Sequence, residues 1–298
     1  MNERVHYTYC PVCGSGDIKN VLSVKDHAVS GETFPVAECG SCSLRFTQDV
    51  PGAEYIAPYY KSVDYISHTD KSKGLIGILY KKVRNRTLIR KRKLIEQETG
   101  CKKCNLLDIG SGTGAFINEM IRQGWQATGI EPDDGARSLA KKLYGIDMEN
   151  EGRFYQLPAD SFDVITLWHV LEHIHDLAGY VQRLKLLLKK NGKLFIAVPN
   201  YTSLDARIFK EFWAAYDVPK HLYHFSPRSM QRLIEINGMK IIRYLPMWYD
   251  SFYISLLSSR YKTGKSRWIA SLCNGLRSNI NAWGKATNCS SIIYVISN

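Results

Sequence analysis

The residues best suited to chemistry surround a glycine-rich turn in the stretch LLDIGSGTGAF. Gly110, Gly112 and Gly114 let the backbone bend sharply and approach a ligand, and a helix that begins after them would present free N–H groups. Asp108 precedes the first glycine, where it would repel a pyrophosphate but would suit a cationic amino group. Glu131 ends the next apolar run, and its carboxylate can accept both hydroxyls of a ribose. The pattern therefore favours a ligand with a ribose and an amino group over a dinucleotide.

Two Cys-x-x-Cys pairs near the start of the chain have the spacing of metal ligands: Cys10, Cys13, Cys39 and Cys42. Four thiolates satisfy tetrahedral zinc, and the bound metal supplies the folding energy that a short, loop-rich segment cannot obtain from a core. We predict a structural zinc ribbon, with reduced and unmetallated cysteines as the alternative. A later pair in GCKKC stands alone before an apolar run, and we interpret its spacing as coincidental.

The stretch LWHVLEHIH places His169, Glu172 and His173 within five positions, which matches the inverted zinc-peptidase signature. A peptidase needs both histidines on one helix and a third ligand beyond it. Here, however, His169 directly follows an apolar run with the pattern of a buried strand, which favours one wall of a ligand pocket. Two more histidines, His221 and His224, lie in the aromatic-rich stretch DVPKHLYHFS. Histidine titrates near neutral pH and suits a base that removes a proton from an acceptor.

The elements that must position these side chains alternate between strand and helix patterns over residues 105 to 200. The apolar runs NLLDIG, QATGIEP, FDVITLW and KLFIAVPN are separated by amphipathic segments that end in glycine, such as DDGARSLAKKLYG. This alternation predicts a parallel sheet covered on both faces by helices. An apolar run, SSIIYVIS, closes the chain.

An acid followed by Gly-x-Gly-x-Gly, with a second acid about 20 residues later, is similar to class I S-adenosylmethionine-dependent methyltransferases. The resemblance continues through FDVITLWHVLEHIHD and LLLKKNGKLFIAVPN and covers roughly residues 100 to 298. It implies an α/β fold, a Rossmann-like seven-stranded sheet with helices on both faces, and S-adenosyl-L-methionine as cofactor. The LEH segment is common in the small-molecule members, including those of ubiquinone synthesis. A zinc ribbon before such a core, and a histidine before an aromatic-Phe-Ser run, are similar to bacterial sugar C-methyltransferases.

The resemblance also assigns roles to single residues. Those implied to bind the cofactor are Asp108, Gly110 and Gly112 around the methionine moiety, Gly114 at the helix approach, Glu131 on the ribose, Pro132 and Asp133 beside the adenine, and His169 near the sulfonium. Our first candidate for a catalytic base is His221, followed by His169 and His224.

The predicted function is methyl transfer to an oxygen or carbon of a small acceptor: a sugar, a quinone or phenol, or a lipid-linked metabolite. One alternative is a zinc-ribbon RNA methyltransferase, although the chain lacks an Asn/Asp-Pro-Pro-aromatic motif for base amines. Another is a binding module that keeps the cofactor pocket without activity.

The net charge of +12 is concentrated between Lys71 and Lys93, which hold ten Lys and Arg residues and no Asp or Glu. An anionic partner there would be a membrane surface, RNA or a phosphorylated substrate. Because aromatic residues that could stack on bases are not interleaved through the basic run that follows Tyr80, we favour a core-packing helix with a solvated basic face.

We expect three regions: a zinc ribbon over residues 1–50, a helical, basic linker over 51–98, and a methyltransferase domain over 99–298. Insertions at about 201–226 and 249–288 would cap the substrate. No apolar run approaches the ~20 residues that cross a bilayer, and the start of the chain lacks the apolar middle of a secretory signal. We therefore expect a cytoplasmic protein.

Overall fold

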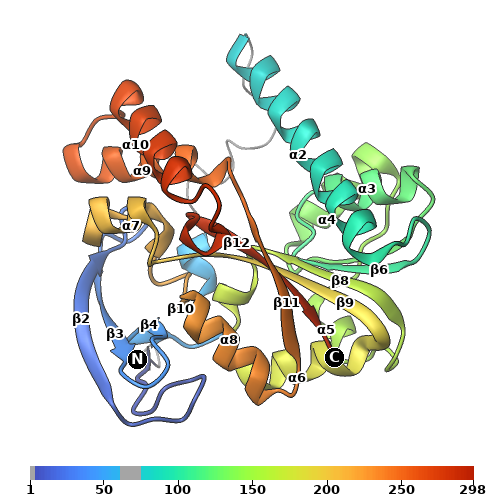
Figure 1. The fold of residues 1–298 in the computed structure, drawn as a ribbon, viewed down its shortest axis with the longest axis horizontal. Coiled ribbons are helices and arrows are strands. Elements are labelled where there is room, and N and C mark those ends of the chain that lie inside the picture. Colours follow the sequence, from blue (N-terminus) through green and yellow to red (C-terminus); the bar gives the residue numbers. More distant parts are fainter. Residues whose placement is uncertain (1–3, 61–74) are drawn as a thin grey trace. The chain divides into compact units, whose positions relative to one another are not determined.

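A computed structural model describes residues 4–60 and 75–298 of the chain, drawn in Figure 1. The chain divides into two compact units. Unit 1 comprises Met1–Tyr65, His169–Val181 and Ile196–Ile296, and unit 2 comprises Ile66–Trp168, Gln182–Phe195 and Ser297–Asn298. None of the helices in the described ranges is both long and apolar enough to cross a membrane.

Unit 2 contains the predicted parallel sheet. Its strands are β6 (Asn105–Ile109), β7 (Gln126–Ile130), β8 (Phe162–Trp168) and the first part of β9 (Leu188–Pro199), in the order β9-β8-β6-β7. Strand β6 runs parallel to both β7 and β8. The leucine, isoleucine and valine side chains of these runs are buried, as expected for a sheet that is covered on two faces.

Helices α2 (Leu75–Thr99), α3 (Ala115–Arg122), α4 (Asp134–Tyr144) and α5 (Glu151–Phe154) complete unit 2, and α6 (Leu177–Leu187) runs into it from unit 1. Local sequence sets the ends of α4. The Asp133 carboxylate accepts the Ala136 N–H at its start, and Gly145 takes a left-handed conformation at its end. The helix predicted after the glycine turn is α3, which packs against β7 and α2.

The strand position beyond β7 is reduced to one parallel bridge between Ile130 and Glu149. The residues that follow, in the stretch GRFYQLPADSF, form α5 and turns instead of a strand. In the described part of the chain the sheet therefore has six strands rather than seven.

Unit 1 begins with the cysteine-bearing ribbon. Its strands are β1 (Arg4–Val5), β2 (Ile18–Lys25), β3 (Thr33–Cys39), β4 (Arg45–Thr47) and β5 (Val50–Pro51). A short strand from a distant segment, β10 (Tyr223–His224), pairs with β4 and extends this sheet to the order β10-β4-β3-β2. The ribbon thus shares a sheet with the segment that carries two of the candidate histidines.

The aromatic side chains of residues 201–226 fill the core of unit 1. Trp213 and Tyr216 are buried in a cluster with Phe34, Val36 and Tyr59 of the N-terminal region. The elements that present them are η1 (Ala57–Tyr60), α7 (Leu204–Phe209), η3 (Lys210–Phe212) and η4 (Ala214–Tyr216). These rings therefore join the segment to the ribbon.

The remainder of unit 1 is built on the end of β9. Strands β12 (Ser291–Ser297) and β11 (Lys240–Pro246) follow it in the order β9-β12-β11. Helix α8 (Pro227–Ile236) starts at a capping box formed by Ser226 and Ser229. The expected insertion at 249–288 is a helical hairpin of α9 (Asp250–Thr263) and α10 (Trp268–Asn281), followed by η5 (Ala286–Asn288). The short η2 (Leu171–His173) carries the LEH segment.

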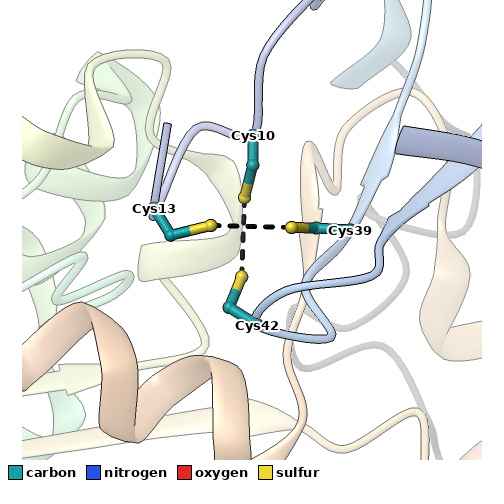
Figure 2. Close-up of side chains that lie close together, drawn as sticks. All are labelled: Cys10, Cys13, Cys39 and Cys42. Atoms are coloured by element: carbon teal, nitrogen blue, oxygen red, sulfur yellow. Dashed lines mark hydrogen bonds between the residues drawn. The ribbon is translucent and has the colours of Figure 1, made fainter. Parts of the chain in front are cut away.

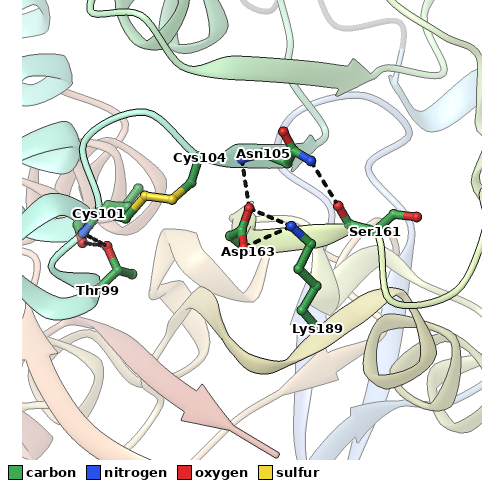
Figure 3. The surroundings of a disulfide bond; sticks show 8 residues. Thr99, Cys101, Cys104, Asn105, Ser161, Asp163 and Lys189 are labelled. Carbon is green, nitrogen blue, oxygen red and sulfur yellow. Dashed lines mark hydrogen bonds and ion pairs between the residues drawn. A yellow bond between two sulfur atoms is a disulfide. The ribbon is translucent and has the colours of Figure 1, made fainter.

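Contrary to the sequence interpretation, Cys101 and Cys104 are joined by a disulfide directly before β6 (Figure 3). The Cys101 N–H donates to Thr99 Oγ1, and the next residue, Asn105, donates its N–H to the Asp163 carboxylate. The disulfide thus lies within the short segment that connects α2 to β6.

Candidate active site

The glycine turn of unit 2 uses backbone conformations that favour glycine. Gly110, Gly112 and Gly114 have φ angles of 69°, 54° and 75°. A Cβ at Gly114 would lie 2.8 Å from the Ala140 Cβ, whereas a Cβ at Gly112 would meet nothing within 4 Å. Gly114 therefore permits close helix packing, and the space above Gly112 is free for a ligand.

This difference predicts two distinct effects of substitution by alanine. Gly114→Ala should lower the free energy of unfolding by about 2–3 kcal/mol, because a clash adds to the backbone strain. Gly112→Ala should lower the free energy of unfolding by only about 1 kcal/mol, the cost of backbone strain. It should weaken binding of the cofactor more than Gly114→Ala does, because its Cβ would occupy the space for the ligand. Thermal unfolding and calorimetric titration measure both effects, and an equal loss of stability in the two variants would contradict the assignment.

Asp108 is buried at the end of β6, with 2% of its surface exposed. Thr166 Oγ1 donates a 2.6 Å hydrogen bond to Asp108 Oδ1. Burial raises the pKa of Asp108 to about 6, although the Thr166 hydrogen bond and the charge of Lys91 oppose this shift. A carboxylate in this environment gains most from a cationic ligand group.

The Glu131 carboxylate is fixed by two backbone donors. It accepts the Gly112 N–H at 2.7 Å and the Asp133 N–H at 3.0 Å, while burial raises its pKa. Each oxygen keeps a lone pair for a ribose hydroxyl. Pro132 and Asp133 follow as exposed residues at the start of α4. The donor set, the open space above Gly112 and the buried Asp108 together fit S-adenosylmethionine.

The described part of the basic stretch contacts this side of unit 2. Arg84 donates to Thr113 Oγ1 in the glycine turn at 3.1 Å. Lys91 Nζ lies 4.1 Å from the centre of the Trp168 ring, and Arg92 pairs with glutamates of α2 and α3. Sequence reasoning missed these contacts, because a run of like charges carries no signal of which members face inward.

His169 of unit 1 lies between two carboxylates. Its Nε2 is 2.9 Å from Asp250 Oδ2, and its Nδ1 is 3.3 Å from Glu172 Oε1. Burial disfavours the charged ring, but the bonds to Asp250 and Glu172 outweigh it and raise the pKa of His169 to about 10. The ring is therefore protonated at neutral pH, which makes it a poor proton acceptor. Its φ of 59° is also unusual for a non-glycine residue.

His221 and His173 lie edge to face, with ring centres 4.6 Å apart. His221 Nδ1 lies 2.8 Å from the Ala215 carbonyl, and His173 Nδ1 lies 3.0 Å from the Lys220 carbonyl. Because a carbonyl only accepts, both Nδ1 atoms carry hydrogen, and the lone pair of each neutral ring is at Nε2. Burial, followed by the charge of His221, lowers the pKa of His173 to about 4.

Glu172 completes this cluster and is fully buried. The cluster offers three ligand atoms within 4.8 Å of one another, one each from Glu172, His173 and His221. At this spacing the three side chains can share a proton or a metal ion. The cluster brings together the two histidine stretches that sequence analysis singled out. Sequence analysis did not identify Asp250, the first residue of α9 and a partner of His169, because no motif marks it.

His224 has a different environment. Its Nε2 lies 3.1 Å from Thr47 Oγ1, and that hydroxyl donates to the His221 carbonyl. The ring packs edge-on against Tyr216, and burial lowers the pKa of His224 well below its usual value. These contacts favour a structural role between the ribbon and the His221 segment.

The four ribbon cysteines converge on one point (Figure 2). The sulfur atoms of Cys10 and Cys42 are 3.5 Å apart, as are those of Cys13 and Cys39. Zinc–sulfur bonds of ~2.3 Å in a tetrahedron place neighbouring sulfurs ~3.8 Å apart. The donor set and spacing thus fit one zinc ion with no open position.

Comparison with known proteins agrees with this geometry. Residues 62–244 match the family described as "Methyltransferase domain". Over 175 residues the chain is 30% identical to the ubiquinone biosynthesis O-methyltransferase of Nitrosococcus oceani, a match that covers 54% of this chain and 71% of the relative. The human mitochondrial ubiquinone biosynthesis O-methyltransferase is 30% identical over 164 residues, but this match covers only 49% of this chain and 44% of the human protein.

Among solved structures, the magnesium protoporphyrin IX methyltransferase of Synechocystis PCC 6803 with bound SAH is similar in fold. The TM-score is 0.51 at 12% identity, covering 80% of this chain and 97% of that one. The family match covers most of the chain and agrees with the parallel sheet and the acid-flanked glycine turn. The chain therefore belongs to the S-adenosylmethionine-dependent methyltransferases.

Proposed function

We propose that this enzyme methylates a hydroxyl oxygen of a phenol-like small molecule, with His221 as the general base. The observation that carries the proposal is the 2.8 Å hydrogen bond from His221 Nδ1 to the Ala215 carbonyl, which leaves Nε2 free to accept a proton. The relatives' name, ubiquinone biosynthesis O-methyltransferase, supports an oxygen acceptor on an aromatic ring. A carbon or sugar acceptor is the less supported alternative.

On the cofactor side, Asp108 would hold the amino group, the turn of Gly110, Gly112 and Gly114 would admit the methionine moiety, and Glu131 would bind the ribose hydroxyls. Pro132 and Asp133 would flank the adenine. The bound cofactor supplies a methyl group already activated by the sulfonium. The protein therefore has to orient the acceptor and remove one proton.

On the acceptor side, a phenol with a pKa near ~10 keeps its proton at neutral pH and is a weak nucleophile. His221 Nε2 would take this proton as the oxygen becomes the nucleophile. The lowered pKa of His173 keeps that neighbouring ring neutral, so it carries no positive charge that would oppose protonation of His221. His169, held as an imidazolium by Asp250 and Glu172, would favour the developing negative charge on oxygen.

The ribbon has a separate role in this proposal. One zinc ion bound by Cys10, Cys13, Cys39 and Cys42 would be structural, because four thiolates leave no position for substrate. For the stretch Lys71–Lys93 we propose a supporting role in the fold, since Arg84, Lys91 and Arg92 are engaged within unit 2. Lys71 lies outside the described residues.

The test is a transfer assay with methyl-labelled cofactor. Purified enzyme is incubated with a metabolite extract, a panel of catechols and hydroquinones, and total RNA, and the labelled product is identified by mass spectrometry. We expect an O-methylated phenol, formed by wild type and by His224→Gln but not by His221→Gln. Label on carbon would overturn the acceptor assignment, and label in RNA would revive the RNA methyltransferase. Cofactor binding without any product would indicate a binding module.

The raised pKa of Asp108 predicts a pH-dependent affinity for the cofactor. A cationic amino group binds the carboxylate, so affinity should rise with pH through about 6, and binding near that pH should release a proton. In the free protein the sign is opposite. Because the folded-state pKa exceeds that of an unfolded aspartate, stability should fall as pH rises from about 4 to about 6.

Calorimetry in two buffers of different ionisation enthalpy measures the released proton. Below about pH 6 the dissociation constant should increase by up to about tenfold per unit of pH. Asp108→Asn should bind more weakly and lose most of this dependence, with a remainder from Glu131, whose pKa burial also raises. An unchanged pH profile in Asp108→Asn would contradict the role of Asp108.

A further inference from the structure

Helix α10 presents its apolar side chains to solvent. Between 52% and 83% of the surface of each of six residues is exposed: Trp268, Ile269, Leu272, Leu276, Ile280 and Trp283. At 3.6 residues per turn, these positions fall within one arc of ~120° on the helix and its continuation. A continuous apolar face of this kind marks an interaction site, whereas scattered exposed residues do not.

The opposite face of α10 is small and polar, and this face packs into unit 1 beside α9 and α7 (Figure 1). Ser271 and Ser278 are buried, and Ser278 Oγ donates a 2.7 Å hydrogen bond to Asp205. Gly275 allows a close approach to α9, where a Cβ would lie 2.6 Å from the Phe252 ring. A surface helix of a globular protein normally buries its apolar face and exposes its polar face, and α10 does the reverse.

The surroundings of this apolar face are basic. The 48 residues after Asp250 contain six Lys and Arg residues and no Asp or Glu. Lys262, Lys265 and Arg267 are exposed just before α10, and Arg277 and Lys285 are exposed within and after it. Tryptophans at both ends, apolar residues between them and flanking cations are the composition of a helix that lies in a lipid headgroup layer.

We propose that the exposed face of α10 binds the surface of a bilayer that contains anionic phospholipids, with the helix lying in the plane of the headgroups. The 14-residue helix is ~21 Å long, shorter than the ~30 Å hydrocarbon core, so it lies on the bilayer instead of spanning it. A second copy of the chain is a poorer occupant, because it would bring the same cations face to face.

This proposal does not depend on the methyl-transfer reaction, because its test measures binding of lipid alone. Full-length protein is sedimented with vesicles of phosphatidylcholine, or of phosphatidylcholine mixed with phosphatidylglycerol. Wild type should bind the anionic vesicles, and its partition coefficient should fall as salt is added.

The apolar face is tested by the triple variant Ile269→Gln, Leu272→Gln and Leu276→Gln. We expect at least a tenfold loss of vesicle binding, because these side chains supply the buried apolar area. The matched control replaces exposed apolar residues of other helices, Ile121→Gln, Leu143→Gln and Ile236→Gln, which are 40% to 47% exposed. Since all six residues lie at the surface, both variants should keep the melting temperature of wild type.

The charges are tested by Lys262→Gln, Lys265→Gln and Arg267→Gln. Each neutralised residue should lower the partition coefficient for anionic vesicles about fivefold. The control variant Lys102→Gln, Lys103→Gln and Lys142→Gln removes the same charge from exposed sites in unit 2 and should bind nearly as wild type does. Equal losses in both charge variants would point to net charge alone and would overturn the assignment to α10.

Two further outcomes would also overturn it. One is wild-type protein that fails to bind either vesicle. The other is concentration-dependent self-association in sedimentation velocity that the α10 apolar variant abolishes, which would assign the face to a second copy.

Discussion

His221→Gln is expected to lower kcat by about 10²–10⁴-fold while leaving the affinity for the cofactor nearly unchanged. The amide has no basic nitrogen, so it cannot take the proton that His221 Nε2 would accept. It can still donate a hydrogen bond to the Ala215 carbonyl, so the loop geometry should persist. Single-turnover transfer to the identified acceptor, over a range of pH, measures the effect.

The control for this variant is His224→Gln, which removes a buried histidine of the same short segment. Because the His224 ring bonds Thr47 Oγ1 and packs against Tyr216, its loss should reduce the melting temperature more than kcat. A comparable fall of kcat in both variants would show that the effect is structural. A rate that persists in His221→Gln but disappears in Asp250→Asn would transfer the base role to the His169 pair.

Cys39→Ser is expected to release the zinc and unfold the ribbon. Metal binding in small zinc sites contributes an apparent ~10–16 kcal/mol to folding. Cys39 ends β3 and is fully buried, so serine would lose one metal bond and leave a hydroxyl in an apolar site. Metal content by mass spectrometry and thermal unfolding, with and without a chelator, measure the loss.

The matched control is Cys273→Ser, a free and exposed cysteine outside the ribbon, which should leave metal content and melting temperature unchanged. Retention of one zinc per chain in Cys39→Ser would contradict the site. Activity should fall together with the metal, because the Thr47 N–H donates to the Leu222 carbonyl and its hydroxyl to the His221 carbonyl. The ribbon thereby holds the segment that carries the proposed base.

The arrangement of the glycine turn, Asp108 and Glu131 could be predicted from sequence because the information is local. Asp108 and Glu131 each lie at or just after the end of a strand, and the register of β6 and β7 places Ile109 beside Ile130. Parallel strands that end at the same edge bring their following residues together without any long-range knowledge. The glycines are equally local, since each occupies a left-handed conformation within the turn itself.

The histidine cluster could be predicted only in part, because its contacts join distant segments. His173 and His221 were recognised as candidates by residue type, but their contact depends on how residues 171–173 meet residues 215–221. Asp250 lies 81 positions after His169 and has no motif. The raised pKa of His169 follows from its bonds to Asp250 and Glu172, and the first of these contacts leaves no signal in the sequence.

The pairing of β10 with β4 has a consequence for cooperativity. The backbone bonds of Tyr223 and His224 exist only while Arg45 and Phe46 remain in place, so both segments should exchange their amide hydrogens as one unit. A chain cut after the ribbon would leave β10 as an open edge beside buried aromatic rings, a template for aggregation. In this protein the boundary of a sequence motif is therefore not the boundary of a folding unit.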